Sequence, residues 1–266
     1  MKKKKIVIIL ILLLSIFMLV ILSGKVFGMF YNKYACENCY LDFANMNEKK
    51  IFSIDKCVLF SNCNAINRAN SNASFTIENL YQYTDIALFI NNNSTENTLE
   101  NTLKSVKINN LHFTTTPSVG TQKIFYKNIN SFADNNIPNE NAFENELIFN
   151  VSSNDNEDLN TPTLYNNCAN PIVLSYINNN IKTDYALTDS SSTSVTYDGS
   201  LLKRCGVLLN SLNAKFSFDI FITNNLEQEF KCTVFIEPPV EANDKSLYDG
   251  AITINQNTNY MFYRYK

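Results

Sequence analysis

The residues best suited to chemistry in this 266-residue chain are its cysteines. Four of the seven lie near the start, where Cys36 and Cys39 form a C-x2-C pair and Cys57 and Cys63 form a C-x5-C pair. Two close pairs are typical of structural zinc sites, although the second pair is wider than zinc knuckles use. The same four residues are also suited to one or two disulfides, or to unpaired thiols. All three interpretations stay open.

The remaining cysteines, Cys168, Cys205 and Cys232, lie in the second half of the chain. Cys205 and Cys232 fall in segments that we expect to be neighbouring strands. They are therefore the predicted disulfide pair of this half. In an exported protein pairing is the first expectation, and an odd number of cysteines leaves at least one thiol over.

The sequence carries no motif of a known catalytic or cofactor site. His112 is the only histidine, and we expect it to lie half exposed on a strand. There is no G-x-S-x-G or H-E-x-x-H, and six glycines make phosphate-binding loops improbable. The acidic stretch 154–158 lacks the central glycine and the later glutamate of a calcium loop. We assign no catalytic, cofactor-binding or metal-binding residue and expect a protein that is not an enzyme. An exported hydrolase using scattered carboxylates is the alternative.

Some bacterial surface sandwiches join a lysine to an asparagine beside a buried acid, and both residue types are abundant here. Their abundance prevents the sequence from indicating any one site for such a bond. It is also typical of an AT-rich genome, so we interpret the many asparagines mainly as the mark of a low-GC bacterium. Locally they still indicate turns, because asparagine tolerates left-handed backbone.

Residues 1–31 form the segment that decides where in the cell the protein lies. Lys2, Lys3, Lys4 and Lys5 precede a run from Ile6 through Leu14 to Leu22 that only Ser15 interrupts. As a helix this run spans about 26 Å, close to the lower limit for crossing a hydrocarbon core of about 30 Å. The lysines favour a cytoplasmic N-terminus. We predict a single-pass membrane anchor with the rest of the chain, including its C-terminus, outside the cell.

A cleaved signal peptide is the rival interpretation of the same segment. Val26-Phe27-Gly28 offers a passable cleavage site, which would leave Met29 as the new terminus. The apolar run is longer than the usual signal-peptide core, and no A-x-A motif follows it. Both interpretations export the remainder, and cleavage would make the protein a secreted one, such as a filament or matrix subunit.

The charge of the exported part argues against nucleic acid as a partner. The chain has 22 basic and 25 acidic residues, and five of the basic ones lie within residues 1–31, which contain no acid. The remainder therefore has 17 basic and 25 acidic residues, a net charge of −8. An acidic surface without a basic stripe does not attract phosphates. We expect no cofactor, and as partners the lipid bilayer through the N-terminal helix and another surface protein or a glycan.

Period-two alternation beyond the anchor predicts an all-β fold. Residues 73–79 and 106–113 alternate, the second with a slip at Asn109-Asn110 that suggests a bulge, and 215–223 and 229–237 form a hairpin around Asn224-Asn225. Residues 61–72 are predicted to be a loop and Asn178 to Asn180 a turn. Many short strands without helical periodicity indicate immunoglobulin-like antiparallel sandwiches.

We predict five segments: an anchor (1–31), a stalk (32–50), a first sandwich (51–151), an acidic linker (152–162) and a second sandwich (163–266). Hydrophobic residues make up 45% of the chain, which is enough to fill two cores. The expected function is binding, adhesion or an envelope-structural role at the cell surface.

Overall fold

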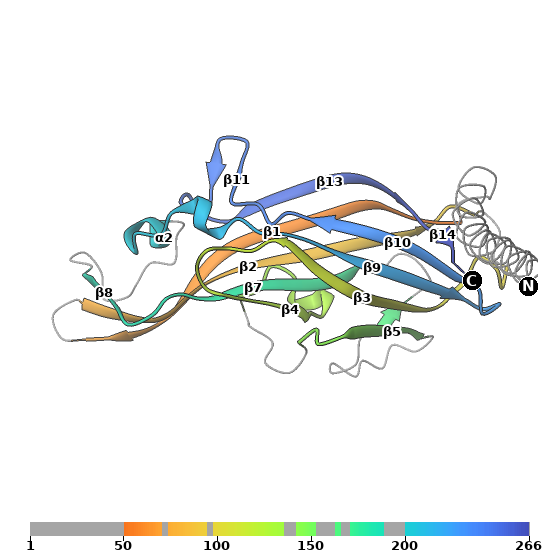
Figure 1. Ribbon diagram of the computed structural model, residues 1–266, viewed down its shortest axis with the longest axis horizontal. Coiled ribbons are helices and arrows are strands. Elements are labelled where there is room, and N and C mark those ends of the chain that lie inside the picture. Colours follow the sequence, from red (N-terminus) through yellow and green to blue (C-terminus); the bar gives the residue numbers. More distant parts are fainter. Residues whose placement is uncertain are drawn as a thin grey trace, which may run out of the picture. The chain divides into compact units, whose positions relative to one another are not determined.

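The computed structural model describes residues 51–70, 74–94, 98–135, 142–152, 163–165, 171–188 and 200–265. They belong to one compact unit that runs from Lys50 to Lys266. This unit consists almost entirely of β-strands, nearly all antiparallel, as Figure 1 shows. The all-β prediction is confirmed for this part of the chain. No helix in it is long and apolar enough to cross a membrane, and the predicted anchor and stalk lie outside the described residues.

The strands form two six-stranded sheets and a two-stranded ribbon. Sheet A has the order β13-β1-β2-β7-β4, with β8 also paired to β2; its strands are β1 (Phe52–Ala69), β2 (Ser74–Asn92), β4 (Thr121–Tyr126), β7 (Ile172–Lys182), β8 (Tyr185–Thr188) and β13 (Ile252–Met261). Sheet B has the order β14-β10-β9-β3-β5-β6; its strands are β3 (Leu103–Thr115), β5 (Glu146–Ser152), β6 (Thr163–Tyr165), β9 (Lys215–Asn224), β10 (Glu229–Ile236) and β14 (Tyr263–Arg264). The ribbon pairs β11 (Glu241–Ala242) with β12 (Lys245–Ser246).

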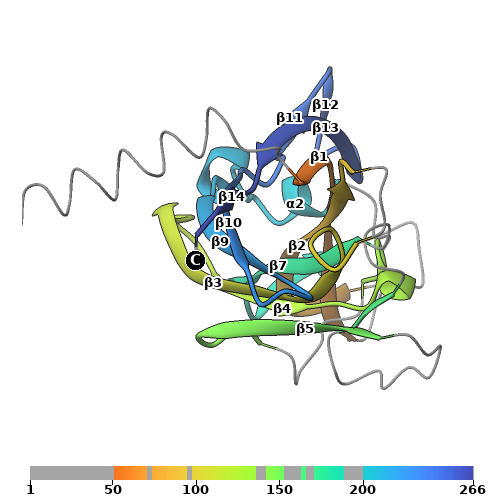
Figure 2. The same ribbon diagram turned by 90° about the vertical axis from the view of Figure 1, so that its right-hand side faces the viewer.

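The two sheets share one apolar core. Alternate residues of each strand point inward, as in β9, where Phe216, Phe218, Ile220 and Ile222 are all buried. Figure 2, which looks along this unit, shows β3, β9 and β10 on one side and β1, β2 and β7 on the other. Rings from opposite sheets meet in this core, because Tyr176 of β7 stacks on Phe216 at 5.5 Å. The unit is therefore a sandwich of two facing sheets.

A second core lies at the end of the sandwich where β1 and β2 extend past sheet B (Figure 1). The short helix α2 (Ser200–Arg204) and the 3-10 turn η2 (Leu209–Leu212) cover this extension. They contribute Leu201, Leu202 and Leu212, all fully buried. Within 201–212 the chain forms the end of α2 and the turn η2, joined by a short non-helical stretch, and no strand.

The prediction of two sandwiches with a linker at 152–162 is wrong for the described residues. Both sheets take strands from both halves of the chain: β2 pairs with β7, β1 with β13, and β3 with β9. The sequence repeats the same strand and turn pattern in each half, and that local pattern does not indicate whether strands pair within a half or between halves.

The predicted loop at 61–72 is also wrong for residues 61–69, because β1 continues as a strand to Ala69. Its asparagine-rich part pairs with β2 through Ala69↔Phe75. Burial against the second core overrides the turn preference of asparagine, since Cys63 and Ala65 both pack there.

The predicted turn at Asn178 to Asn180 is instead part of β7. Asn178 is fully buried, accepts a hydrogen bond from Gln122 Nε2 at 2.9 Å and donates to the carbonyl of Val119 at 3.1 Å. The chain passes so close that a Cβ on Gly120 would lie 2.1 Å from Asn178 Oδ1. The turn tendency survives only as a positive φ of 56° at Asn180, beside an irregularity in the β2–β7 register.

Two local predictions are confirmed. Strands β9 and β10 form the expected hairpin around Asn224-Asn225. The slip at Asn109-Asn110 is a bulge, because the β3–β9 register shifts between Asn109 and His112, and Asn110 has a φ of 55°.

Candidate functional site

The most unusual chemical feature of the sandwich is a buried ion pair between Lys127 and Asp85. Lys127 Nζ lies 2.6 Å from Asp85 Oδ2, and the side chains are only 2% and 0% exposed. Two further groups donate to the same carboxylate: Ser175 Oγ to Oδ1 at 2.6 Å and the Ala133 backbone N–H to Oδ2 at 2.8 Å. Lys127 Nζ also donates to the carbonyl of Asp134 at 2.5 Å. We call these residues the Asp85 centre.

Three neighbouring strands of sheet A position this centre. Asp85 lies on β2 directly opposite Ser175 on β7, and Phe125 of β4 lies opposite the same serine. Lys127 follows β4 at once, and its N–H still donates to β7 through the Val173 carbonyl at 3.1 Å. The neighbours of Asp85 along β2, Ile86 and Thr84, point to the other face. The centre therefore lies on the face of sheet A that is turned away from sheet B.

A small third core covers this face and excludes water from the pair. It is built from Tyr81, Tyr83, Phe125 and Ile177, all buried. The Tyr83 ring centroid lies 5.5 Å from Lys127 Nζ, which adds a cation–π contact. Beside it Phe132, which follows the 3-10 turn η1 (Ile129–Ser131), contacts Phe60 of β1 with ring centroids 6.3 Å apart.

Burial raises the pKa of Asp85 above its ordinary value, and the hydrogen bonds from Lys127, Ser175 and Ala133 offset this only in part. Burial is the dominant cause because the dry surroundings disfavour the charged carboxylate. The Asp85 centre therefore holds a carboxyl group and an amine in contact, in surroundings that favour the neutral form of the acid.

A second acid, Asp219 of β9, lies on the outward face of sheet B. Its carboxylate receives hydrogen bonds from Thr233 Oγ1 at 2.6 Å and Asn110 Nδ2 at 2.7 Å, and Lys231 Nζ lies 2.9 Å away. Burial acts to raise the pKa of Asp219, but these three donors outweigh it and hold the pKa below the ordinary value. The bulge directs the side-chain amide of Asn110 toward the Asp219 carboxylate, so the predicted irregularity positions one of the donors to this acid.

The cation Lys231 belongs to an aromatic cluster on the same face. Its Nζ lies 5.5 Å from the ring centroid of Phe221, and Lys107 Nζ lies 5.1 Å from the same ring. Tyr265 packs edge-on against Phe221 at 5.3 Å. Phe221 is only 8% exposed, so the lysine stems and Tyr265 shield this ring rather than present it to a partner.

The structure does not bring Cys57 and Cys63 together. Both lie on β1, six positions apart along an extended strand, which separates them by about 20 Å. One zinc ion therefore cannot bind both, and they cannot form a disulfide with each other. The predicted loop at 61–72 would have allowed the chain to fold back near these cysteines, whereas β1 keeps it extended. Cys36, Cys39 and Cys168 lie outside the described residues.

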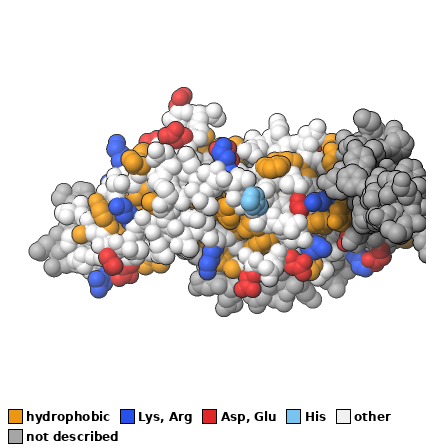
Figure 3. Space-filling view, in the orientation of Figure 1, with side chains coloured by type: hydrophobic (Ala, Val, Ile, Leu, Met, Phe, Trp, Pro, Cys, Tyr) orange, Lys and Arg blue, Asp and Glu red, His pale blue; other side chains and the backbone are white. Residues whose placement is uncertain are grey.

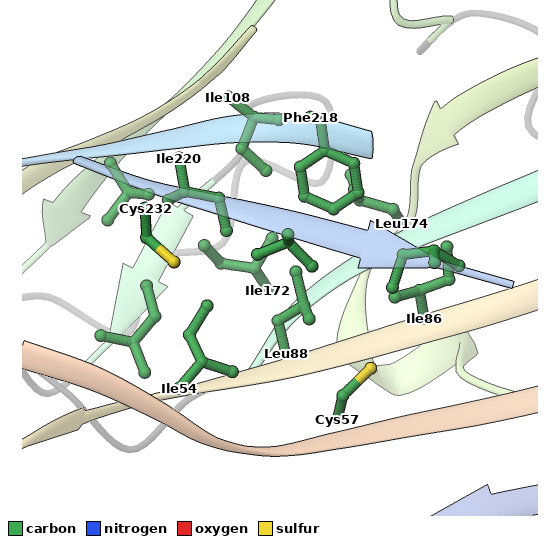
Figure 4. Packing of buried hydrophobic residues seen from close by; sticks show 14 of the residues in the cluster. Ile54, Cys57, Ile86, Leu88, Ile108, Ile172, Leu174, Phe218, Ile220 and Cys232 are labelled. Atoms are coloured by element: carbon green, nitrogen blue, oxygen red, sulfur yellow. The ribbon is translucent and has the colours of Figure 1, made fainter. Parts of the chain in front are cut away.

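The predicted disulfide between Cys205 and Cys232 is not formed, because both are free thiols. Cys205 follows helix α2 in the second core, whereas Cys232 lies on β10 in the core between the sheets. Figure 4 shows Cys232 and Cys57 among the isoleucines and leucines of that core. Burial raises the pKa of both Cys57 and Cys232 to about 12, so each stays a protonated, apolar side chain.

His112 is exposed on β3, on the face that Figure 3 presents, with charged side chains of both signs scattered around it. Its strand partner is Ser217. Among the described residues no group of three or more histidine, cysteine, aspartate or glutamate side chains is placed to hold a metal ion. The anchor residues Ile6, Leu14 and Leu22 lie outside the described residues.

Comparison with known proteins does not add a functional assignment. No protein-family model matches the chain. No curated protein and no solved structure matches it either.

Sequence reasoning missed the Asp85 centre altogether. The run from Asp85 to Asn91 predicts a central strand that is apolar on both faces, with the charged Asp85 at its start. In the structure Asp85 lies in the middle of β2. A charge within a strand buried on both faces is the signal that was available, because such a charge requires a partner.

Proposed function

We propose that this protein is a single-pass, membrane-anchored surface protein whose β-sandwich lies outside the cell and has a binding, adhesion or envelope-structural role. The observation that carries the location is the lysine block followed by the run from Ile6 to Leu22. A lysine block keeps its end of such a helix in the cytoplasm. The lipid bilayer is then one partner, and another surface protein or a glycan is the other.

The order of the strands supports an immunoglobulin-like topology for the sandwich. In immunoglobulin constant domains strands A, B, E and D form one sheet and C, F and G the other. Taking β1, β2, β3, β4, β7, β9 and β10 as A to G gives A-B-E-D for part of sheet A and C-F-G for part of sheet B. Strands β13, β14, β5 and β6 are additions at the edges, and β8 is a further addition paired to β2. Domains of this architecture are frequent at cell surfaces, although the fold alone does not name a ligand.

The placement of the two buried acids supports a binding or structural role over a hydrolase. A carboxylate active site needs two acids that converge on one substrate. Asp85 and Asp219 lie on different sheets, and the hydrogen bonds of each are made within the fold. The exported hydrolase remains the alternative function, and a catalytic pair elsewhere on the chain would support it.

Membrane fractionation of the full chain, carrying a C-terminal tag and expressed in a bacterium, tests the proposal. The protein should stay with the membrane after alkaline extraction, and protease added to spheroplasts should remove the tag. Leu14→Arg is the perturbing variant, because a charge at the helix centre opposes insertion by about 3 kcal/mol. Leu14→Ile is its matched control and should behave as the unaltered protein.

N-terminal sequencing of the same material separates the alternatives. An intact N-terminus in the membrane fraction supports the anchor. A new terminus at Met29 with protein in the medium would instead establish the secreted form. Recovery of the full chain in the cytosol, with its tag protected from protease, contradicts export altogether.

A further inference from the structure

We infer that Lys127 and Asp85 become covalently joined by an amide between Lys127 Nζ and Asp85 Cγ, an isopeptide bond that forms within the folded sandwich. The structure contains every group that this condensation needs. The bond requires no oxidant, enzyme or cofactor, so it does not depend on the compartment or on the surface role proposed above.

The reacting groups are held together by three strands rather than by flexible side chains. Lys127 Nζ lies 2.6 Å from one oxygen of the carboxyl group that it would attack. Val173 holds the backbone of Lys127, and Ser175, opposite Asp85, holds the carboxyl group. Well-oriented intramolecular pairs react with effective concentrations of about 10⁵ M or more. The fold thus supplies the proximity that free lysine and aspartate lack in water.

The surroundings also favour the protonated acid that the reaction needs. The nucleophile must be a neutral amine and the acid must be a protonated carboxyl group, whereas an ammonium and a carboxylate do not condense. Both side chains are withdrawn from water, and burial raises the pKa of Asp85. Transfer of one proton from Nζ to the carboxylate removes both buried charges at once.

Each carboxyl oxygen has its own hydrogen-bond donor. The Ala133 N–H donates to Oδ2, and the Ser175 hydroxyl donates to Oδ1. The first polarises the carbonyl and stabilises the negative charge that develops on Oδ2 during attack. The second stabilises the hydroxyl group that leaves. A carboxyl group with donors on both oxygens and an amine in contact is arranged for acyl transfer.

The step balances in atoms and charge. The neutral Lys127 Nζ attacks Cγ of the protonated Asp85 carboxyl group, the Nζ–Cγ bond forms and the Cγ–Oδ1 bond breaks. The leaving hydroxyl group takes one proton from Nζ and departs as water, and Oδ2 remains as the amide oxygen. Once the released water has left this closed site, hydrolysis of the new amide lacks a water molecule in position, because the third core excludes solvent.

The bond would tie β2 to the end of β4 across β7. Asp85 and Lys127 are 42 residues apart in the sequence, so the link closes a long loop and restrains the unfolded chain as a disulfide would. Unlike a disulfide, it would survive reducing agents.

Tryptic mapping of the full, denatured and reduced chain tests the inference directly. Trypsin does not cleave after an acylated lysine. The expected product is therefore one branched peptide, Ala69–Lys104 joined to Ile124–Lys182, lighter than the sum of the two by one water molecule. Fragmentation should place the link between Asp85 and Lys127. Boiling in denaturant and reductant should leave it intact.

Two controls accompany the map. Lys127→Arg keeps a buried positive charge beside Asp85 but offers no amine, so its map should show no branched peptide. Within the unaltered protein, Lys215 Nζ lies 3.0 Å from Glu237 Oε2, but these side chains are 52% and 62% exposed. That pair should stay unlinked, because it lies in water rather than in a closed site.

The unaltered chain alone decides the outcome, even where Lys127→Arg fails to fold. Recovery of the tetrapeptide Ile124–Lys127 in the same yield as its neighbour Ile108–Lys123, from folded protein after prolonged incubation, would overturn the inference. A link from Lys127 to any acid other than Asp85 would overturn it as well.

Discussion

Replacing Lys127 with an uncharged residue should leave the Asp85 carboxylate buried without a counter-ion. Lys127→Met is the variant that does so. Methionine keeps an unbranched apolar side chain of similar length but has no amine. Asp85, at 0% exposure, would then retain only the donors Ser175 and Ala133. Removing one partner of a buried ion pair typically costs about 3–5 kcal/mol, and the two remaining hydrogen bonds place this case near 3 kcal/mol.

The sharpest comparison is between Lys127→Met and the double variant Lys127→Met with Asp85→Asn. Neither variant can form the amide, so the difference between their free energies of unfolding measures the cost of the buried carboxylate without a counter-ion. We expect the double variant to be more stable by about 2 kcal/mol at pH 7.5 although it carries one more substitution. Asparagine is neutral, its side-chain oxygen can accept from the Ala133 N–H, and the Ser175 hydroxyl can turn to accept from its NH2 group.

Urea unfolding at two pH values is the assay. With an m-value of about 2–3 kcal/mol/M, the midpoint of the double variant should lie roughly 1 M above that of the single variant at pH 7.5. Burial raises the pKa of Asp85, so the folded state holds its proton more tightly than the unfolded state. The cost of the stranded charge is therefore absent below the unfolded pKa of about 3.9 and grows as the pH rises through the folded pKa. The gap should close near pH 4.

Equal midpoints for the two variants at pH 7.5, or a gap that does not change with pH, would refute this account of the Asp85 centre. The unaltered protein adds a separate quantity. Where it carries the amide in place of the ion pair, closure of the 42-residue loop contributes about 4 kcal/mol by the loop-entropy relation.

Three further outcomes follow from the same structure. The Tyr176 hydroxyl is buried without a hydrogen-bond partner among the described residues, so Tyr176→Phe should stabilise the fold by about 1 kcal/mol, and a loss of stability in thermal unfolding would reveal a partner for that hydroxyl. Burial raises the pKa of Cys57 and Cys232 to about 12, so iodoacetamide should modify them only in denaturant, and equal labelling of the native protein would contradict their burial. Asp219→Asn should cost about 1–2 kcal/mol at pH 7, because hydrogen bonds hold the pKa of Asp219 below its ordinary value. That stability is present above the unfolded pKa and is lost as the pH falls below about 4, so a difference from the unaltered protein that persists at pH 2 would contradict it.

Local features of the chain could be predicted from the sequence because their causes are local. The β9–β10 hairpin follows from two alternating segments around Asn224-Asn225, and the bulge in β3 follows from a break in alternation at Asn109-Asn110. Each depends on the period of the side chains and on the backbone preference of asparagine. The all-β class follows from many such segments together.

The pairing of distant strands was decided only by tertiary structure. Both halves alternate in the same way, and nothing in the alternation distinguishes β2 paired with β7 from β2 paired within its own half. Long-range pairing also overrode local preference, because Asn178 lies fully buried within a strand where asparagine runs indicate a turn.

The Asp85 centre shows the same division. The sequence by itself determined a β-rich chain, its hairpin and bulge, and an apolar segment behind four lysines. It contained Asp85, Lys127 and Ser175 at separations of 42 and 90 residues from the aspartate. Only the side-by-side alignment of β2, β7 and β4 brings them into contact, and only the aromatic cover over that face removes the water that would keep them apart as separate ions. Chemistry that depends on exclusion of water is a property of the packed fold, because no single segment can create a dry site by itself.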